Sequence, residues 1–153
     1  MAFTGRQDEI GKIGSGEIIG NVGIVSTYTV FEDGLKGGLF AKYNSTTGGV
    51  ESINGSATPT VAGVVKRDVT GAIEDAGTYT ADNNVTVDVI ESGLVTLETV
   101  PGVTINKFDP VFVSNQGNAD DGRVTNAPAT GNVTLFSYFY QEVDTNVWAI
   151  VLK

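Results

Sequence analysis

The side chains that could carry out acid–base chemistry in this sequence are mainly carboxylates, because the chain contains no histidine and no cysteine. Two pairs of acids are adjacent in the sequence, Glu74-Asp75 and Asp120-Asp121. Two carboxylates at a suitable separation can hydrolyse a glycosidic bond without histidine. Both pairs lie in polar stretches containing glycine and alanine, whereas an acid with a shifted pKa needs a partly apolar cleft. We interpret them as exposed loop charges and predict that the chain is not an enzyme.

Motifs for metals and cofactors are equally weak. The segment Asn118-Ala119-Asp120-Asp121-Gly122 groups oxygen ligands beside a glycine, but the phasing of a calcium loop and its closing glutamate are missing. The cluster from Gly11 to Gly16 lacks the Gly-Lys-Ser/Thr ending of a phosphate-binding loop. The absence of histidine and cysteine removes the usual zinc sites and thiol chemistry. We predict no catalytic residue, no metal and no cofactor.

Length and charge limit the remaining classes of protein. The 153 residues are enough for one domain with a single core. Eighteen acids against nine basic residues give a net charge of −9, which would repel a nucleic-acid backbone. No stretch reaches the roughly 18 apolar residues of a membrane span, and no export signal can be read. We therefore expect neither a nucleic acid nor a membrane as partner.

The elements that must position any site are strands. Apolar residues come in short runs bounded by Gly, Asn, Asp and Pro, and no long stretch keeps the period of an amphipathic helix. The candidate strands are Val22–Val30, Gly38–Tyr43, Thr60–Arg67, Val85–Ile90, Leu94–Thr99, Pro110–Ser114, Thr134–Val143 and Val147–Leu152. Eight short strands predict an all-β fold, either a small β-barrel or a β-sandwich.

Local turn signals refine this prediction. The alternating run Val85–Ile90 is followed by Glu91-Ser92-Gly93 and a second run from Leu94. This pattern predicts a hairpin in which Gly93 supplies the left-handed turn residue. Pro110 should be the first residue of its strand or lie at an edge, because proline cannot donate to a ladder. The stretches Asn44–Gly49 and Ser114–Gly122 have the composition of turns and loops.

The N-terminal region differs from the remainder. Residues 1–20 contain five glycines and few apolar residues, which is too much backbone entropy for a helix or a central strand. We predict an extended arm over residues 1–21 and a single domain over 22–153. The larger apolar residues of the arm are spaced irregularly and could insert into grooves of a neighbour; they are Phe3, Ile10, Ile13, Ile18 and Ile19. A disordered terminus is the alternative.

Aromatic residues gather in the expected strand near residue 138. Phe136, Tyr138 and Tyr140 should share one face of it, and Phe139 should lie on the other. One face would then belong to the core and the other to a subunit interface, where tyrosine is favoured. A central strand wrapped entirely by its own chain is the alternative. Trp148 lies in a continuous apolar run near the C-terminus and is predicted to be core.

The order of segments resembles the small capsid cement, or head decoration, proteins of tailed bacteriophages. The segments that carry the resemblance are Gly38–Tyr43, Thr60–Val65 with its Gly-Val-Val, the Val-x-Val run and glycine of Thr86–Leu97, Phe108–Val113 and Val147–Leu152. The likeness covers most of residues 38–153. This chain differs in having Phe108 where a glycine often precedes Asp109-Pro110.

The resemblance implies a β-rich protein that stabilises the shell from the exterior of the capsid, after synthesis in the bacterial host cytoplasm. Its partner would be the major capsid protein, and it would form a homo-oligomer, a trimer more than a dimer. Binding would involve the arm residues above and Tyr138 and Tyr140. The alternatives are another virion or tail structural protein, a carbohydrate-binding module that stacks sugars on Tyr138, Tyr140 or Trp148, and a minimal hydrolase.

Overall fold

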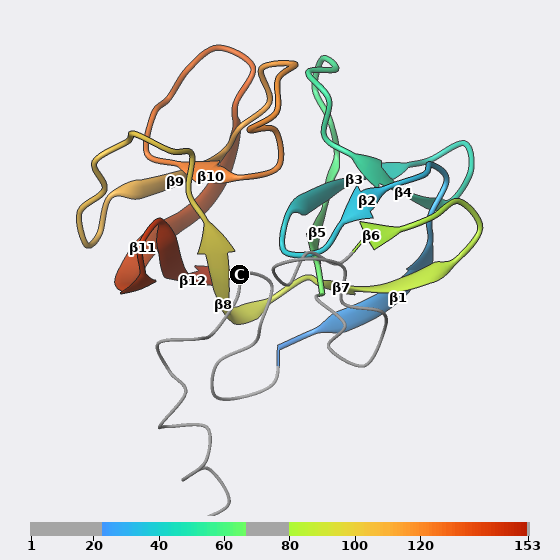
Figure 1. The fold of residues 1–153 in the computed structure, drawn as a ribbon, viewed down its shortest axis with the longest axis horizontal. Helices are drawn as coiled ribbons and strands as arrows, with labels where there is room; N and C mark the ends of the chain where they lie inside the picture. Colours follow the sequence, from blue (N-terminus) through green and yellow to red (C-terminus); the bar gives the residue numbers. More distant parts are fainter. Residues whose placement is uncertain (1–22, 67–79, 153) are drawn as a thin grey trace, which may run out of the picture.

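The computed structural model describes residues 23–66 and 80–152, and within these ranges the protein contains strands and turns but no helix. Two five-stranded sheets and one two-stranded sheet are present, all with antiparallel ladders. Figure 1 shows the two large sheets as separate groups beside each other. The prediction of an all-β fold is confirmed, and of the two architectures the β-sandwich is the one that fits.

The strands follow one another along the chain as β1 (Val25–Thr29), β2 (Leu35–Lys36), β3 (Phe40–Asn44), β4 (Gly49–Ser52), β5 (Val61–Val65), β6 (Thr80–Ala81), β7 (Thr86–Ile90), β8 (Gly93–Glu98), β9 (Pro110–Val113), β10 (Val124–Thr125), β11 (Val133–Asp144) and β12 (Val147–Leu152). The first sheet has the order β1-β7-β5-β3-β4, and the second sheet has the order β10-β9-β11-β12-β8. The short strands β2 and β6 pair with each other.

All eight predicted strands are present within one to three residues at each described end. Pro110 is the first residue of β9, as its missing N–H requires. The stretch Asn44–Gly49 is the turn of the β3–β4 hairpin, and Ser114–Gly122 contains no strand. The strands that the sequence did not predict are β2, β4, β6 and β10. They have two to four residues each, which is too short for a periodic signal.

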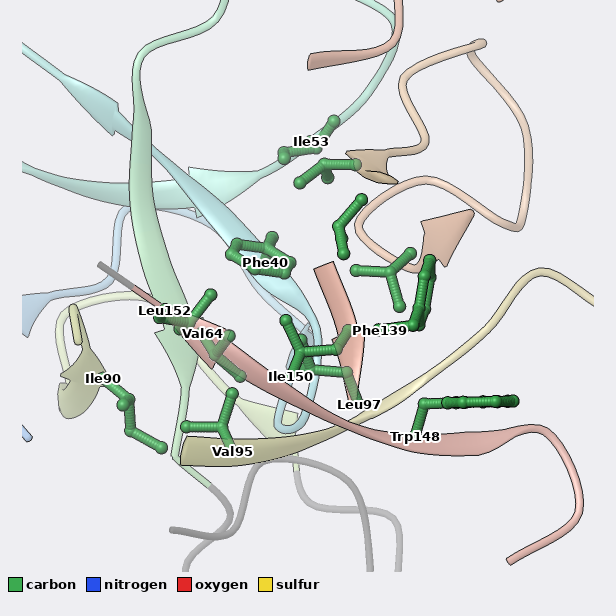
Figure 2. Close-up of a cluster of buried hydrophobic side chains, with 13 residues drawn as sticks. Phe40, Ile53, Val64, Ile90, Val95, Leu97, Phe139, Trp148, Ile150 and Leu152 are labelled. Atoms are coloured by element: carbon green, nitrogen blue, oxygen red, sulfur yellow. The ribbon is translucent and has the colours of Figure 1, made fainter. Parts of the chain in front are cut away.

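One core cluster fills the space between the two large sheets. Phe40, Val64 and Ile90 reach it from the first sheet. Phe139 and Trp148 reach it from the second, with their rings in edge-to-face contact at a centroid distance of 5.7 Å. Figure 2 shows these side chains converging between the strands. Trp148 is only 8% exposed, which confirms its prediction as core and prevents it from stacking on a sugar.

A second cluster lies on the opposite face of the first sheet. Ala41, Val65 and Val89 point into it, whereas their neighbours in sequence point into the cluster between the sheets. The β2–β6 pair covers this face and contributes Leu35 and Ala81. Strand β5 at the centre of the first sheet has the sequence Val-Ala-Gly-Val-Val, a continuous apolar run typical of a strand that is covered on both faces.

The predicted hairpin between the runs ending at Ile90 and starting at Leu94 is wrong. Strand β7 pairs with β1 and β5 in the first sheet, and β8 pairs with β12 in the second. Glu91 and Ser92 form a corner between the sheets, and their backbone N–H groups donate to the Ile24 carbonyl at 2.8 and 3.4 Å. Gly93 has the positive φ that was expected, at 122°. The glycine therefore marks a change of sheet here. Ile24, which lies just before β1, supplies the acceptor that a hairpin partner would have supplied.

Each large sheet curls so that its two edges meet at one point. Isolated parallel bridges join Val30 to Val50 in the first sheet and Thr99 to Val124 in the second. Single bridges do not make a ladder, so neither sheet is a closed barrel. Gly49 is required at the first of these contacts, because a Cβ there would lie 2.3 Å from the Phe31 ring and 2.4 Å from the Thr29 carbonyl oxygen.

Candidate partner-binding surface

Strand β11 places aromatic side chains on the outside of the second sheet. Phe136 is 83% exposed and Tyr140 is 40% exposed, while Tyr138 between them is half-buried. Phe139, which points to the opposite face, is fully buried. The predicted alternation of exposed and buried side chains is therefore confirmed, and a subunit interface on the exposed face stays a prediction. The alternative, a strand wrapped entirely by its own chain, is wrong.

A tight turn before β9 adds a further ring to this face. The Asp109 backbone N–H donates to the Asn106 carbonyl at 3.1 Å, which closes a four-residue turn. Phe108, its third residue, has φ of 72°, and a positive φ at that position defines a type II turn. The Phe108 N–H donates to the Phe139 carbonyl at 2.7 Å, and this bond fixes the turn against β11. The Phe108 ring is 66% exposed and lies 5.6 Å from that of Tyr138.

The carboxylate of Asp109 holds this turn in shape. Its Oδ2 accepts from the Asn106 backbone N–H at 2.9 Å and from the Asn126 side-chain amide at 2.7 Å. These bonds, the Asn106 one first, lower the pKa of the Asp109 carboxyl below its ordinary value because they favour the charged form. Asp109 is a positioning residue for the neighbouring ring.

An irregularity in β11 turns Phe136 outward. The register between β11 and β9 shifts between Thr134 and Tyr138, and Phe136 in this interval has φ of 53°. The next residue, Ser137, is buried and its hydroxyl donates to the Val151 carbonyl of β12. Bulges of this kind redirect a side chain at the expense of ladder pairing.

Two bulky residues thus combine left-handed backbone with exposed rings. That conformation costs roughly 1–2 kcal/mol for a residue with a Cβ, and an exposed apolar ring gains little from its own fold. Strained positions of this kind concentrate at functional sites. Phe108 and Phe136 are therefore the candidate contact residues of this face.

A cation completes the arrangement. The Lys107 ammonium lies 5.1 Å from the centroid of the Phe108 ring and 4.9 Å from that of Tyr140. Both distances fall within the range of a cation–π interaction. We call the set Lys107, Phe108, Phe136, Tyr138 and Tyr140 the aromatic surface.

The predicted binding residues divide into two groups. Tyr138 and Tyr140 lie in the aromatic surface together with Phe136, which the sequence had placed on the same face. The predicted arm residues Phe3, Ile10, Ile13, Ile18 and Ile19 lie outside the described residues. Sequence reasoning missed Lys107 and Phe108 as surface residues. The available signal was a bulky residue at the position where the resembling proteins often have glycine.

The acid pair Asp120-Asp121 is not a pair of exposed loop charges. Asp121 is only 8% exposed and accepts from the backbone N–H groups of Gln116 and Gly117 at 2.6 and 2.8 Å. Asp120 accepts instead from the Arg123 guanidinium at 2.6 Å. The prediction was wrong for Asp121, because the loop folds back and needs a buried acceptor for its own amides. Each carboxylate thus has a partner within its own loop. The Glu74-Asp75 pair lies outside the described residues.

Within residues 23–66 and 80–152, no group of three or more acidic side chains is arranged to hold a metal ion. None of the elements in these residues is a helix of the length and apolarity needed to cross a membrane.

The described residues thus define an all-β protein of the β-sandwich class with an exposed aromatic surface, a feature that marks candidate protein–protein contact sites. The family is more specific: a model of the XM1 gp53 minor capsid protein matches residues 8–153, and the chain belongs to this family. A solved structure described as "The capsid of Myoviridae Phage XM1" contains a similar chain, with 32% sequence identity and a TM-score of 0.80 over 92% of this chain and 90% of that one. No curated protein sequence matches. The protein is a structural component of a phage capsid.

Proposed function

We propose that this capsid protein is a cement protein, which binds the exterior of the phage head across junctions of the major capsid protein. The observation that carries the proposal is the aromatic surface, which combines left-handed backbone at Phe108 and Phe136 with rings that are 66% and 83% exposed. Membership of a minor capsid protein family supports it, because such a family associates with other capsid components. The function is binding, with no turnover.

The protein would stabilise the shell by raising the free energy needed to separate neighbouring capsomers. A protein bound across the junction of two capsomers adds its binding free energy to the work needed to part them. A standard interface buries on the order of 1,600 Å², and a few aromatic anchors supply most of its energy. We propose Phe136, Tyr138 and Tyr140 as such anchors. Several copies in a symmetric oligomer, with a trimer favoured, would multiply the effect through avidity.

The exterior position is supported by charge. A protein with a net charge of −9 would be repelled by packaged DNA. A position on the outer surface of the shell keeps the protein away from the DNA.

The N-terminal arm is proposed to extend the footprint. Its anchors would be Phe3, Ile10, Ile13, Ile18 and Ile19, and its backbone could be satisfied by strand addition to a neighbouring protein. A chain that lacks residues 1–21 should keep the unfolding temperature of the full chain and bind heads more weakly. Unchanged binding by the truncated chain would remove the arm from the proposal.

The test of the proposed function is binding to undecorated heads. Purified protein is mixed with such heads, pelleted, and imaged by electron microscopy, and its solution mass is measured by light scattering. The chain offers a matched pair of variants: Tyr140 is 40% exposed in the aromatic surface, and Tyr43 is 38% exposed on β3 of the other sheet.

We expect the unchanged protein to decorate the outside of the heads. Tyr140→Ala should bind at least about tenfold more weakly, as expected for an interface anchor, and Tyr43→Ala should bind like the unchanged chain. Heads that stay bare at saturating protein would overturn the proposed function. Equal loss in both variants would remove the aromatic surface from it.

A further inference from the structure

We infer that the Lys107 ammonium of the aromatic surface binds a carboxylate on an apolar segment of the neighbouring capsid protein. This inference rests on the proposed function and names the chemistry of the partner. The docking element would be an Asp or Glu side chain flanked by apolar residues, with the carboxylate on Lys107 and the apolar groups against Phe108, Phe136 and Tyr140.

Lys107 is held against aromatic rings without an anion beside it. Among the described residues, Lys42 lies 3.7 Å from Glu51, and Arg123 lies 2.6 Å from Asp120 and 3.3 Å from Glu98. Lys36, Lys66 and Lys107 have no ion pair within these residues, and of the three Lys107 is the one held against two rings. The fold therefore positions this ammonium without supplying an anion for it.

The rings leave the N–H donors of the Lys107 ammonium without oxygen acceptors. A ring face attracts the positive charge of an ammonium, but the group carries three N–H donors that need oxygen acceptors. Water supplies them in the isolated protein, since Lys107 is exposed. Once a partner covers the surrounding rings, water is excluded, and the ammonium then requires an acceptor from that partner. A carboxylate supplies both the acceptor and the opposite charge.

A two-fold contact between copies of this chain does not suit this surface. In such a contact the same surface meets itself, so Lys107 of one copy would approach Lys107 of the other. An acidic segment of another protein places an opposite charge at this lysine instead.

The test compares three substitutions at one position with a control lysine. Lys107→Gln removes the charge and keeps most of the length, Lys107→Glu reverses the charge, and Lys107→Arg keeps it. Lys36→Gln changes an exposed lysine on β2, away from the aromatic surface. Binding to undecorated heads is measured for each at low and high salt, and circular dichroism checks that every variant melts like the unchanged chain.

We expect Lys107→Gln to weaken binding roughly 10- to 100-fold, the range for a lost charge-assisted hydrogen bond. Lys107→Glu should bind more weakly still, and Lys107→Arg and Lys36→Gln should bind within a few-fold of the unchanged chain. High salt should weaken the unchanged chain more than Lys107→Gln.

The outcomes separate the inference from the proposed function. If the unchanged chain does not bind heads, the proposed function fails. If it binds and Lys107→Gln binds equally with the same salt dependence, the proposed function stands and this inference is wrong. A fall in the solution mass of Lys107→Gln would show that the partner is a second copy, which also overturns it.

Discussion

Because the backbone at Phe108 is left-handed, we expect glycine at this position to be more stable than alanine. In ordinary positions a change from alanine to glycine destabilises a protein by roughly 0.5–1 kcal/mol, because glycine has more freedom in the unfolded chain. At residue 108, where φ is 72°, alanine keeps the clash of its Cβ with the backbone, at a cost of roughly 1–2 kcal/mol. We therefore expect Phe108→Gly to be more stable than Phe108→Ala by about 0.5–1 kcal/mol.

The comparison with the unchanged chain follows from the contacts that the ring makes. Phe108 is 66% exposed, with a tilted contact to Tyr138 and a cation–π contact to Lys107. Each such contact contributes about 0.5–1 kcal/mol at an exposed site. In Phe108→Gly, relief of the backbone strain offsets the loss of these contacts. Its unfolding free energy should therefore lie within about 1 kcal/mol of that of the unchanged chain.

The affinity of Phe108→Gly for heads should fall even though its unfolding free energy changes little. If the ring is an interface anchor, its removal costs about 2 kcal/mol of binding free energy, or roughly 30-fold in affinity. Urea denaturation measures the unfolding free energy, and pelleting with heads measures the affinity. The control is Tyr43→Gly, at a residue that pairs with Val50 in the β3–β4 ladder, which should lose stability and keep its affinity. The reasoning is refuted if glycine at residue 108 is less stable than alanine, or if its affinity for heads is unchanged.

Three further predictions concern the scaffold. Gly49→Ala should lower the unfolding free energy by about 1–3 kcal/mol in urea titrations, because its Cβ would lie 2.3 Å from the Phe31 ring; an unchanged midpoint would contradict the close approach. Phe139→Ala should cost about 3–5 kcal/mol in the same assay, because the side chain is fully buried against Trp148; a loss below 1 kcal/mol would show a loose core. The pKa of the Asp109 carboxyl is depressed in the folded protein. The ionised carboxylate should therefore stabilise the fold at pH values above its unfolded-state pKa of about 3.9, and this stabilisation should disappear as the pH falls through the folded-state pKa. The unfolding temperature of Asp109→Asn should accordingly fall less than that of the unchanged chain between pH 5 and pH 2.5, and parallel curves would argue against this role.

The strands could be predicted because their cause is local. Runs such as Thr86–Ile90 and Val147–Leu152 carry β-branched residues between turn formers, and this pattern is enough to locate a strand. Pairing could not be predicted in the same way. The glycine after Glu91-Ser92 fits a hairpin and a corner equally well, and the choice depended on Ile24, which is 67 residues away in sequence from Glu91. Sequence pattern thus located the strands but not the change of sheet.

The aromatic surface was predictable only in part. The alternation in β11 was enough to place Tyr138 and Tyr140 on one face. It did not show that the face is uncovered, because that depends on where every other segment of the chain lies. Lys107 and Phe108 join the surface because their turn is bound to Phe139 by two backbone hydrogen bonds, from the Phe108 N–H to the Phe139 carbonyl and from the Phe139 N–H to the Asp109 carbonyl. No local pattern encodes these contacts between distant residues.

The departure from glycine before Asp109-Pro110 gives this surface its particular character. A type II turn accepts glycine at its third position without strain, so the turn itself does not need a phenylalanine. The hydrogen bonds of Asp109 to Asn106 and Asn126 hold the turn closed despite the cost of the bulky residue. A relative with glycine there would keep the same turn but lack the ring that packs beside Lys107. Differences in partner preference between this chain and such relatives should therefore concentrate at residue 108, and exchanging only that residue between them should exchange affinity for their respective heads.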